Sequence, residues 1–123
     1  MKYQNNIRKI KKRIISILDK YFGNDYILFL FGSFAKNKID NLSDFDLAIY
    51  SKNPIPPSKI VKVKEELETK AGTLRDIELI NLTQEVDSLL LKNILEEGIL
   101  WKKTKNSEEL LRNLRKHLKN LKR

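Results

Sequence analysis

Two aspartates placed two residues apart are the strongest chemical signal in this sequence. Asp44 and Asp46 follow the pair Gly32-Ser33 after ten intervening residues. Acidic and apolar residues alternate from Asp44 to Tyr50, which predicts a half-buried strand with both carboxylates on one face. Adjacent carboxylates repel each other unless a cation lies between them, and magnesium held by carboxylates and substrate phosphates is a common solution. We therefore expect a magnesium site here.

A third carboxylate is expected on a neighbouring strand. Residues 74–82 have the pattern of a strand, and Asp76 and Glu78 would point to the same side of it. Either side chain would complete a site for two metal ions. Such ions lie about 3.5–4 Å apart and stabilise both the attacking and the leaving oxygens of a displacement reaction. The alternation alone leaves the choice between Asp76 and Glu78 open.

The pair Gly32-Ser33 has the features of a phosphate-binding turn. It ends the longest apolar run of the chain, Tyr26 to Phe31, which predicts a strand buried on both faces. Backbone N–H groups of such a turn, together with the Ser33 hydroxyl, can hold phosphate oxygens. Glycine at position 32 permits close approach of the backbone and unusual φ/ψ angles.

Several other kinds of binding site are excluded by the composition of the chain. The four glycines are at least nine residues apart, so neither a dinucleotide fingerprint nor a P-loop is present. The chain has no cysteine and one histidine, His117, which excludes disulfides, thiolate zinc sites and imidazole clusters. Any metal is therefore expected to be a hard cation bound by carboxylates.

The charge of the chain is unevenly distributed. The net charge is +9, but residues 1–20 carry +6, residues 102–123 carry +7, and residues 21–101 carry −4. Chemistry is expected in the acidic centre, and contact with nucleic acid is expected to be weak or indirect and to fall with salt. The longest apolar run has six residues, too few to cross a membrane. We expect a cytoplasmic protein with no membrane contact.

Hydrophobic periodicity predicts an α/β or α+β fold, with a small mixed sheet of three to four strands flanked by helices. The 123 residues suffice for a single domain. Strands are predicted over residues 26–31, 44–50, 74–82 and 99–101. Helices are predicted over residues 3–21, 58–71 and 83–97, with a last one from Ser107.

The stretch FLFGSFAKNKIDNLSDFDLAIY, residues 29–50, resembles the minimal nucleotidyltransferase (MNT) branch of the DNA polymerase beta-like nucleotidyltransferase superfamily. Looser similarity extends through DIELINL (76–82) and NILEEGILWK (93–102). The resemblance implies the nucleotidyltransferase fold for a domain of residues 1–102. Residues 103–123 fall outside it, and we expect them to form a basic amphipathic helix packed on this domain or on a partner.

The resemblance also implies roles for individual residues. Gly32 and Ser33 would bind the nucleotide triphosphate, with Lys36 near its phosphates, and Asp44 and Asp46 would hold magnesium. Sliding DIELINL onto the strand of the family places Glu78 as the third carboxylate, which shares a metal and helps to deprotonate the acceptor hydroxyl. The sequence departs from the family at Glu78, where many members have aspartate. It departs again at residues 35–37, Ala-Lys-Asn in place of the common Ala-Arg-Gly.

The activity implied by the resemblance is magnesium-dependent transfer of AMP from ATP to a hydroxyl, with release of pyrophosphate. Small stand-alone proteins of this branch resemble antitoxins that modify a tyrosine of a HEPN-type ribonuclease toxin, so a hetero-oligomer is expected. Glu78 motivates an alternative hypothesis, a non-catalytic nucleotide-binding antitoxin that neutralises its partner by occlusion.

Overall fold

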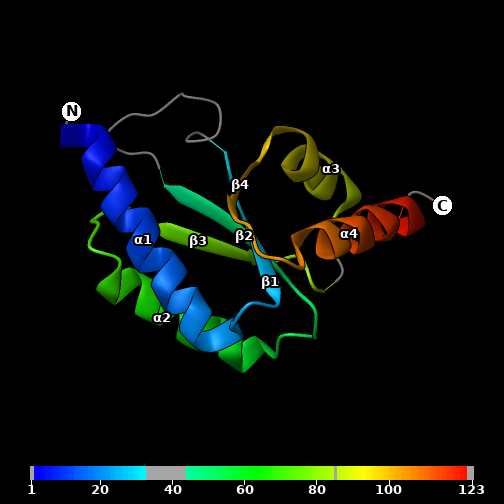
Figure 1. The fold of residues 1–123 in the computed structure, drawn as a ribbon, viewed down its shortest axis with the longest axis horizontal. Coiled ribbons are helices and arrows are strands. Elements are labelled where there is room, and N and C mark those ends of the chain that lie inside the picture. The colour runs from blue at the N-terminus through cyan, green and yellow to red at the C-terminus, as the bar shows by residue number, and fades with distance from the viewer. Residues whose placement is uncertain (1, 33–43, 85, 122–123) are drawn as a thin grey trace.

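The computed structural model describes residues 2–32, 44–84 and 86–121 of the chain. Within these ranges the chain forms four helices and four strands (Figure 1). The prediction of a small mixed sheet flanked by helices is confirmed, and the protein is of the α+β class. In chain order the elements are α1 (Lys2–Phe22), β1 (Tyr26–Phe31), β2 (Phe45–Ser51), α2 (Pro57–Lys70), β3 (Ile77–Asn81), α3 (Ser88–Glu97), β4 (Ile99–Lys102) and α4 (Ser107–Leu121).

The strands form one sheet in the order β3-β2-β1-β4. Strand β1 pairs antiparallel with both β2 and β4, whereas β2 and β3 run parallel. A parallel pair needs a crossover connection, and helix α2 provides it between β2 and β3. Consequently the starts of β2 and β3 lie at the same end of the sheet as the end of β1.

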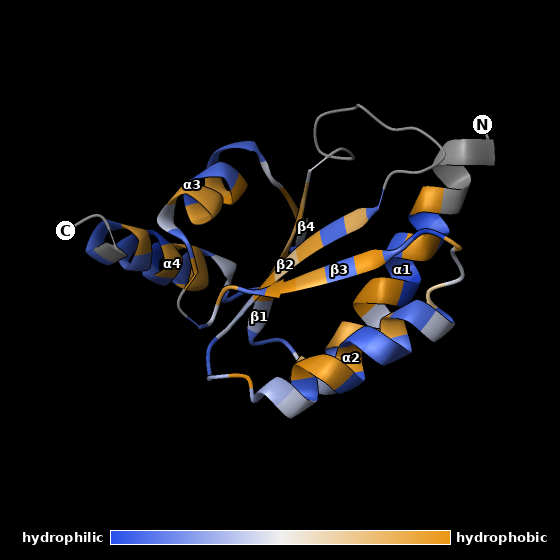
Figure 2. Cartoon of the chain, turned by 180° about the vertical axis from the view of Figure 1, so that it is seen from behind, coloured by the Kyte–Doolittle hydropathy of each residue, from blue (hydrophilic) through white to orange (hydrophobic). Residues whose placement is uncertain are grey.

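Two helices cover each face of the sheet, so the domain has three layers. Helices α1 and α2 pack on one face and α3 and α4 on the other, as the apolar sides of the helices in Figure 2 illustrate. Strand β1 contributes to both cores, with Leu28 and Leu30 on the first face and Ile27 and Phe29 on the second. The strand is therefore buried on both faces, as its apolar sequence predicts.

The predicted boundaries hold for β1 and shift by a residue or so at β2, α2 and β4. Helix α3 differs most, because it begins at Ser88 rather than near Thr83. The Asp87 side chain accepts a hydrogen bond from Leu90 N–H (3.1 Å) and caps the helix there. Upstream, Thr83 N–H donates to Asn81 Oδ1 (2.9 Å), and its hydroxyl accepts from Ser51 N–H (2.9 Å). These bonds hold the chain against β2 in a non-helical turn.

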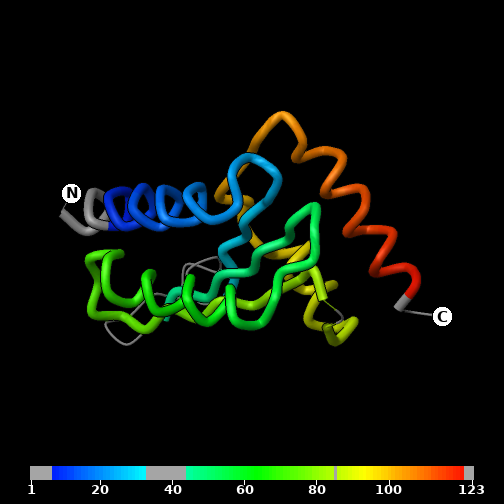
Figure 3. Tube along the Cα trace, turned by 90° about the horizontal axis from the view of Figure 1, so that it is seen from below, coloured from blue at the N-terminus to red at the C-terminus, as the bar shows by residue number. Residues whose placement is uncertain are grey.

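The end of α1 is tied to β4 and to the connection that follows it. Asp19 accepts a hydrogen bond from the buried Tyr26 hydroxyl (2.7 Å) and pairs with Lys102 Nζ (3.3 Å). Asn106 Nδ2 donates to Asp25 Oδ1 (3.0 Å), so the β4–α4 connection is tied to the α1–β1 connection. Figure 3 shows these two connections next to each other. Burial and the bond to Asp19 raise the pKa of Tyr26.

Helix α4 packs on the second face of the sheet. Leu110 and Leu114 are buried there with residues of β1, β2 and α3, while the opposite side of the helix is exposed. The Ser107 hydroxyl accepts a hydrogen bond from Thr104 N–H, which orders the connection before the helix. In the parts of the chain that the structure describes, no helix has the length and apolar character needed to span a membrane.

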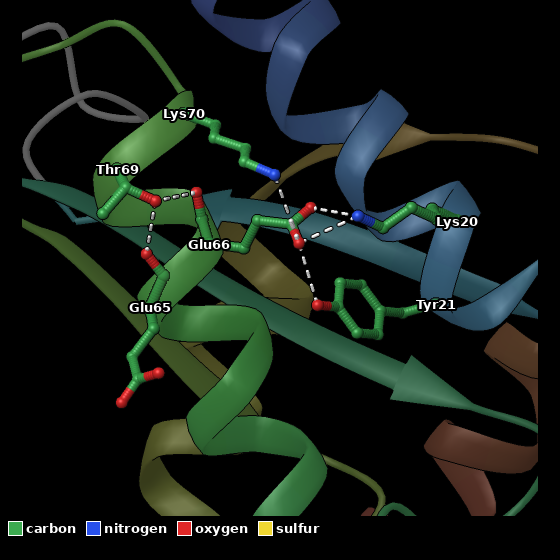
Figure 4. A network of polar contacts seen from close by, with 6 residues as sticks. All are labelled: Lys20, Tyr21, Glu65, Glu66, Thr69 and Lys70. Carbon is green, nitrogen blue, oxygen red and sulfur yellow. Dashed lines mark hydrogen bonds and ion pairs between the residues drawn. The ribbon is translucent and has the colours of Figure 1, made fainter.

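Helices α1 and α2 are joined by a polar network centred on Glu66 (Figure 4). Its carboxylate accepts hydrogen bonds from Lys20 Nζ (2.6 and 2.8 Å) and from the Tyr21 hydroxyl (3.0 Å), and Lys70 Nζ lies 3.8 Å away. The hydrogen bond from Lys20 holds the pKa of Glu66 below its usual value. The ionised carboxylate therefore favours the folded state.

We expect Glu66→Ala to lower the melting temperature at pH 7 by a few degrees, about 2–5 °C, because the two helices lose their shared polar contact. Since the pKa of Glu66 is lowered on folding, this contribution is present above the unfolded pKa and disappears as the pH falls through the folded pKa. The difference between the variant and the parent should therefore shrink in thermal melts below about pH 4.

The control is Glu65→Ala at the preceding position of α2. The Glu65 side chain is exposed and points away from the network (Figure 4), and only its backbone carbonyl accepts a bond, from the Thr69 hydroxyl (3.0 Å). Equal losses in the two variants, or a Glu66→Ala effect that persists at low pH, would contradict a stabilising role for the network.

Candidate active site

The predicted carboxylates gather where β2 and β3 begin. Asp46 is the second residue of β2 and Glu78 the second residue of β3, and their Cα atoms are register partners in the parallel pair. Register partners project to the same side of a sheet, so the two carboxylates lie next to each other. Asp44 is exposed and immediately precedes β2. Strand alternation thus places all three at one end of the sheet.

The structure distinguishes the two candidates for the third carboxylate. Glu78 is the register partner of Asp46 in the parallel strand pair, and its negative charge contributes to the raised pKa of Asp46. Asp76 precedes β3, is exposed, and contributes its backbone carbonyl, which accepts a hydrogen bond from Phe45 N–H (2.9 Å). The geometry therefore brings Glu78, rather than Asp76, into contact with Asp46.

Gly32 lies directly against the Asp46 carboxylate. The residue follows β1, whose last residue, Phe31, is the register partner of Asp46, and it has a φ of 72°. A Cβ atom at position 32 would overlap with Asp46 Oδ2. Glycine is therefore required twice here, for a left-handed backbone conformation and for the approach of the main chain to the carboxylate. The sequence contains no signal for this contact, because it depends on the β1–β2 register.

The carboxylates of this cluster repel one another. Partial burial raises the pKa of Asp46 above its usual value, and the negative charges of Glu78 and Asp44 add to the effect. The strands thus hold like charges together at a cost to stability, which is common where a site is built for a cation or a proton.

The donors of this cluster match a hard cation. Among the described residues, no three acidic or histidine side chains converge closely enough to hold a metal ion between them. Magnesium, however, usually binds through one or two carboxylates and takes its other ligands from water and substrate phosphates. Asp46 and Glu78 provide two such carboxylates, and a cation between them would relieve the repulsion that raises the pKa of Asp46.

We expect Asp46→Asn to raise the melting temperature of the metal-free protein at pH 8 by about 1–3 °C. A carboxyl group with a raised pKa binds its proton more tightly in the folded state, so its ionisation destabilises the fold as the pH rises through that pKa. The advantage of the variant should vanish near pH 4. Thermal melts in chelator across this pH range measure it.

Asp76→Asn is the matched control, because it removes an exposed charge at the same end of the sheet. Its melting temperature should stay close to that of the parent at both pH values. Added magnesium should stabilise the parent and Asp76→Asn but not Asp46→Asn. A parent that gains nothing from magnesium would contradict the cation site.

Two of the predicted nucleotide-binding residues, Ser33 and Lys36, lie outside the described residues. Their assignment remains a prediction from the sequence. Gly32, the third of that set, is placed beside the carboxylates, so the described part of the chain brings together Gly32, Asp44, Asp46 and Glu78.

Comparison with known proteins gives a family match. Residues 12–107 match the family model described as Polymerase beta, Nucleotidyltransferase. No curated protein matches the chain in sequence.

Several solved structures that are similar in fold to this chain are toxin–antitoxin complexes. A toxin–antitoxin structure with AMP-PNP aligns with a TM-score of 0.73 at 19% identity over 90% of this chain and 88% of that chain. An MntA–HepT complex aligns with a TM-score of 0.66 at 18% identity, over 91% and 86% of the two chains. A complex of the tri-AMPylated HEPN toxin of Shewanella oneidensis with its MNT antitoxin gives 0.65 at 18% identity, over 94% and 90%. At these identities the likeness establishes the fold.

Proposed function

Because the chain belongs to the Polymerase beta, Nucleotidyltransferase family, we propose that it transfers AMP from ATP to a tyrosine hydroxyl of a HEPN-type ribonuclease toxin and acts as its antitoxin. The observation that carries the chemistry is the placement of Asp46 and Glu78 side by side, with the Gly32 turn against them. The partner is suggested by the toxin–antitoxin complexes that share this fold.

In this proposal each residue has a distinct role. The Gly32-Ser33 turn and Lys36 bind the triphosphate, and Asp44 and Asp46, with Glu78, hold magnesium. Magnesium, when bound, neutralises phosphate charge and stabilises the attacking and leaving oxygens. The acceptor oxygen attacks the α-phosphorus, the bond from that phosphorus to the bridging oxygen breaks, and pyrophosphate leaves with the electron pair. Glu78 takes the proton of the acceptor hydroxyl.

The raised pKa of Asp46 supports the same assignment. A carboxylate that is repelled by Glu78 and Asp44 has more to gain from a bound cation than an isolated aspartate has. Positioning dominates such phosphoryl chemistry, since most of the rate comes from orientation and electrostatic stabilisation rather than from covalent steps. Strands are suited to this task because their register fixes the separation of the carboxylates.

The test uses ATP labelled on its α-phosphate, magnesium, and cytosol of the source cell. The purified chain and its Asp46→Asn variant are incubated with these components, and protein is then separated from RNA. We expect one labelled protein band with the parent and none with the variant, and mass spectrometry of that band identifies the modified residue. Label found only in RNA would mean that the acceptor is an RNA rather than a protein.

A second candidate function is neutralisation by occlusion, without transfer. The absence of three converging carboxylates within the described ranges favours it, as does glutamate at position 78. In this case Asp46→Asn would suppress the toxicity of the partner in growing cells as well as the parent does. If transfer is the mechanism, the variant fails to rescue growth although it still binds the partner in a pull-down.

A further inference from the structure

The basic helix α1 and the basic β4–α4 connection both lie along the β4 edge of the sheet. Lys102 pairs with Asp19 of α1 (3.3 Å), and Lys11 Nζ lies 5.6 Å from the centre of the Trp101 ring on β4. Figure 3 shows α1, the β4–α4 connection and α4 following one another on this side of the molecule. Asp46 and Glu78 lie on β2 and β3, toward the other edge of the sheet.

Two hollows on this edge are lined by cationic and neutral residues, and no acidic residue contributes to either among those the structure describes. By contrast, a third hollow of about 340 Å³ between α1 and α2 has both Glu65 and Glu66 in its lining. The first, of about 300 Å³ on the outer flank of α1, is lined by Arg8, Lys9, Lys11, Lys12 and Ile15. The second, of about 460 Å³ at the β4–α4 connection, is lined by Asn24, Lys102, Lys103, Thr104, Lys105 and Asn106.

The acidic residues nearest to these hollows already have partners. Asp19 is bonded to Tyr26 and Lys102, and Asp25 accepts from Asn106. Within the described part of the chain, Lys103 and Lys105 are exposed and form no ion pair. Their charge is therefore available to an external anion, together with that of the exposed cations on α1.

We propose that this β4 edge, formed by the outer flank of α1 and the β4–α4 connection, binds the phosphodiester backbone of a nucleic-acid strand. The donors in the two hollows are lysine, arginine, asparagine and threonine, which are the usual partners of phosphate oxygens. A line of such donors spread over two elements matches a chain of phosphates better than it matches a single small anion.

An acidic protein surface fits this edge less well. Protein–protein interfaces are depleted in lysine and enriched in aromatic residues at their centres, whereas nucleic-acid interfaces are strongly basic. Eleven residues line the two hollows, and six of them are lysines. Ile15 is the one large apolar residue in either lining. Trp101 is only 9% exposed and lies under Lys11, so it offers no platform for base stacking. Binding is therefore directed at the backbone and indifferent to sequence.

The test measures binding of the full chain to fluorescent oligouridylate and oligothymidylate of about 20 nucleotides by anisotropy, between about 50 and 200 mM salt. Both probes should bind with affinities within about threefold of each other, because the contacts are to the backbone. Lys103→Gln/Lys105→Gln and Arg8→Gln/Lys12→Gln should each lower the affinity about tenfold and make the logarithmic salt slope shallower by about 1.4.

The matched control is Lys62→Gln/Lys64→Gln, which removes the same charge from exposed positions of α2. It should change the affinity less than twofold, and circular dichroism should show all variants folded. A preference of more than about threefold for either probe would contradict binding through the phosphodiester backbone alone. Equal losses of affinity in the control and the edge variants would overturn the proposal. A chain that binds poly-glutamate but neither oligonucleotide would overturn it as well. The binding is independent of the proposed transfer, so Asp46→Asn should bind the probes as the parent does.

Discussion

Asp46→Asn should lower the rate of nucleotidyl transfer by about 1,000-fold or more while leaving the fold intact. The substitution keeps the shape of the side chain and removes the charge that a bound cation requires. Metal coordination supplies several kcal/mol of transition-state stabilisation, and each 1.4 kcal/mol corresponds to a factor of ten. Single-turnover transfer of labelled AMP to the co-purified partner, at saturating ATP and magnesium, gives the rate directly. Far-ultraviolet circular dichroism of the same preparation checks the fold.

Asp76→Asn and Glu78→Gln complete this experiment. Both remove one acidic charge at the same end of the sheet, but only Glu78 is in contact with Asp46. We expect a large loss for Glu78→Gln and less than about a threefold loss for Asp76→Asn, since the contribution of Asp76 to the fold comes from its backbone carbonyl. A reversed order would assign the third carboxylate to Asp76. Full transfer activity of Asp46→Asn would contradict the catalytic proposal.

The activity and stability predictions for Asp46 have opposite signs, and they have the same cause. The strands hold Asp46 near Glu78 and Asp44, which raises its pKa and destabilises the metal-free fold. Removing the charge relieves that repulsion but also removes the ligand. Functional sites commonly show such a trade between stability and activity.

The elements of this fold that are buried on both faces could be predicted best from the sequence. Strand β1 is apolar throughout because its alternating residues enter two different cores, and its predicted and observed limits coincide. Strand β2 was predictable by its alternation, since Phe45, Leu47 and Ile49 enter the first core while Asp46 is left on the opposite face. Periodicity suffices in these cases because burial and local pattern agree.

Where local hydrogen bonds decide the structure, the sequence pattern was insufficient. The predicted third strand spanned residues 74–82, whereas β3 begins at Ile77, and Leu74 is fully exposed before it. The predicted strand included Leu74, yet the strand starts only where pairing with Phe45 begins. The late start of α3 has the same origin, because Asp87 provides a better cap than the residues near Thr83.

The candidate site was predictable in its composition but not in its contacts. The residue types and spacing identified Asp44, Asp46 and Gly32, since strand alternation and turn chemistry are local properties. Strand alternation leaves the choice between Glu78 and Asp76 open, because it depends on the register between β2 and β3, and only the family resemblance favoured Glu78. The contact between Gly32 and Asp46 likewise requires the antiparallel register of β1 with β2.

Gly32→Ala should reduce transfer by about 100-fold or more, a loss typical of a misplaced catalytic group. The new Cβ atom would overlap with Asp46 Oδ2, so either the carboxylate or the turn must move. The positive φ of 72° adds a backbone penalty of about 1–2 kcal/mol, which should lower the melting temperature. Rates of AMP transfer and thermal melts are measured on the same protein samples.

Gly23→Ala separates these two effects. Gly23 has a φ of 64°, close to that of Gly32, but a Cβ atom there would meet nothing within 4 Å. The two variants should therefore share the loss of stability, whereas only Gly32→Ala should lose transfer activity, because only its side chain displaces Asp46. Matching activities in the two variants would mean that the carboxylate tolerates displacement, and the close approach of Gly32 would then be a requirement of the fold rather than of the chemistry.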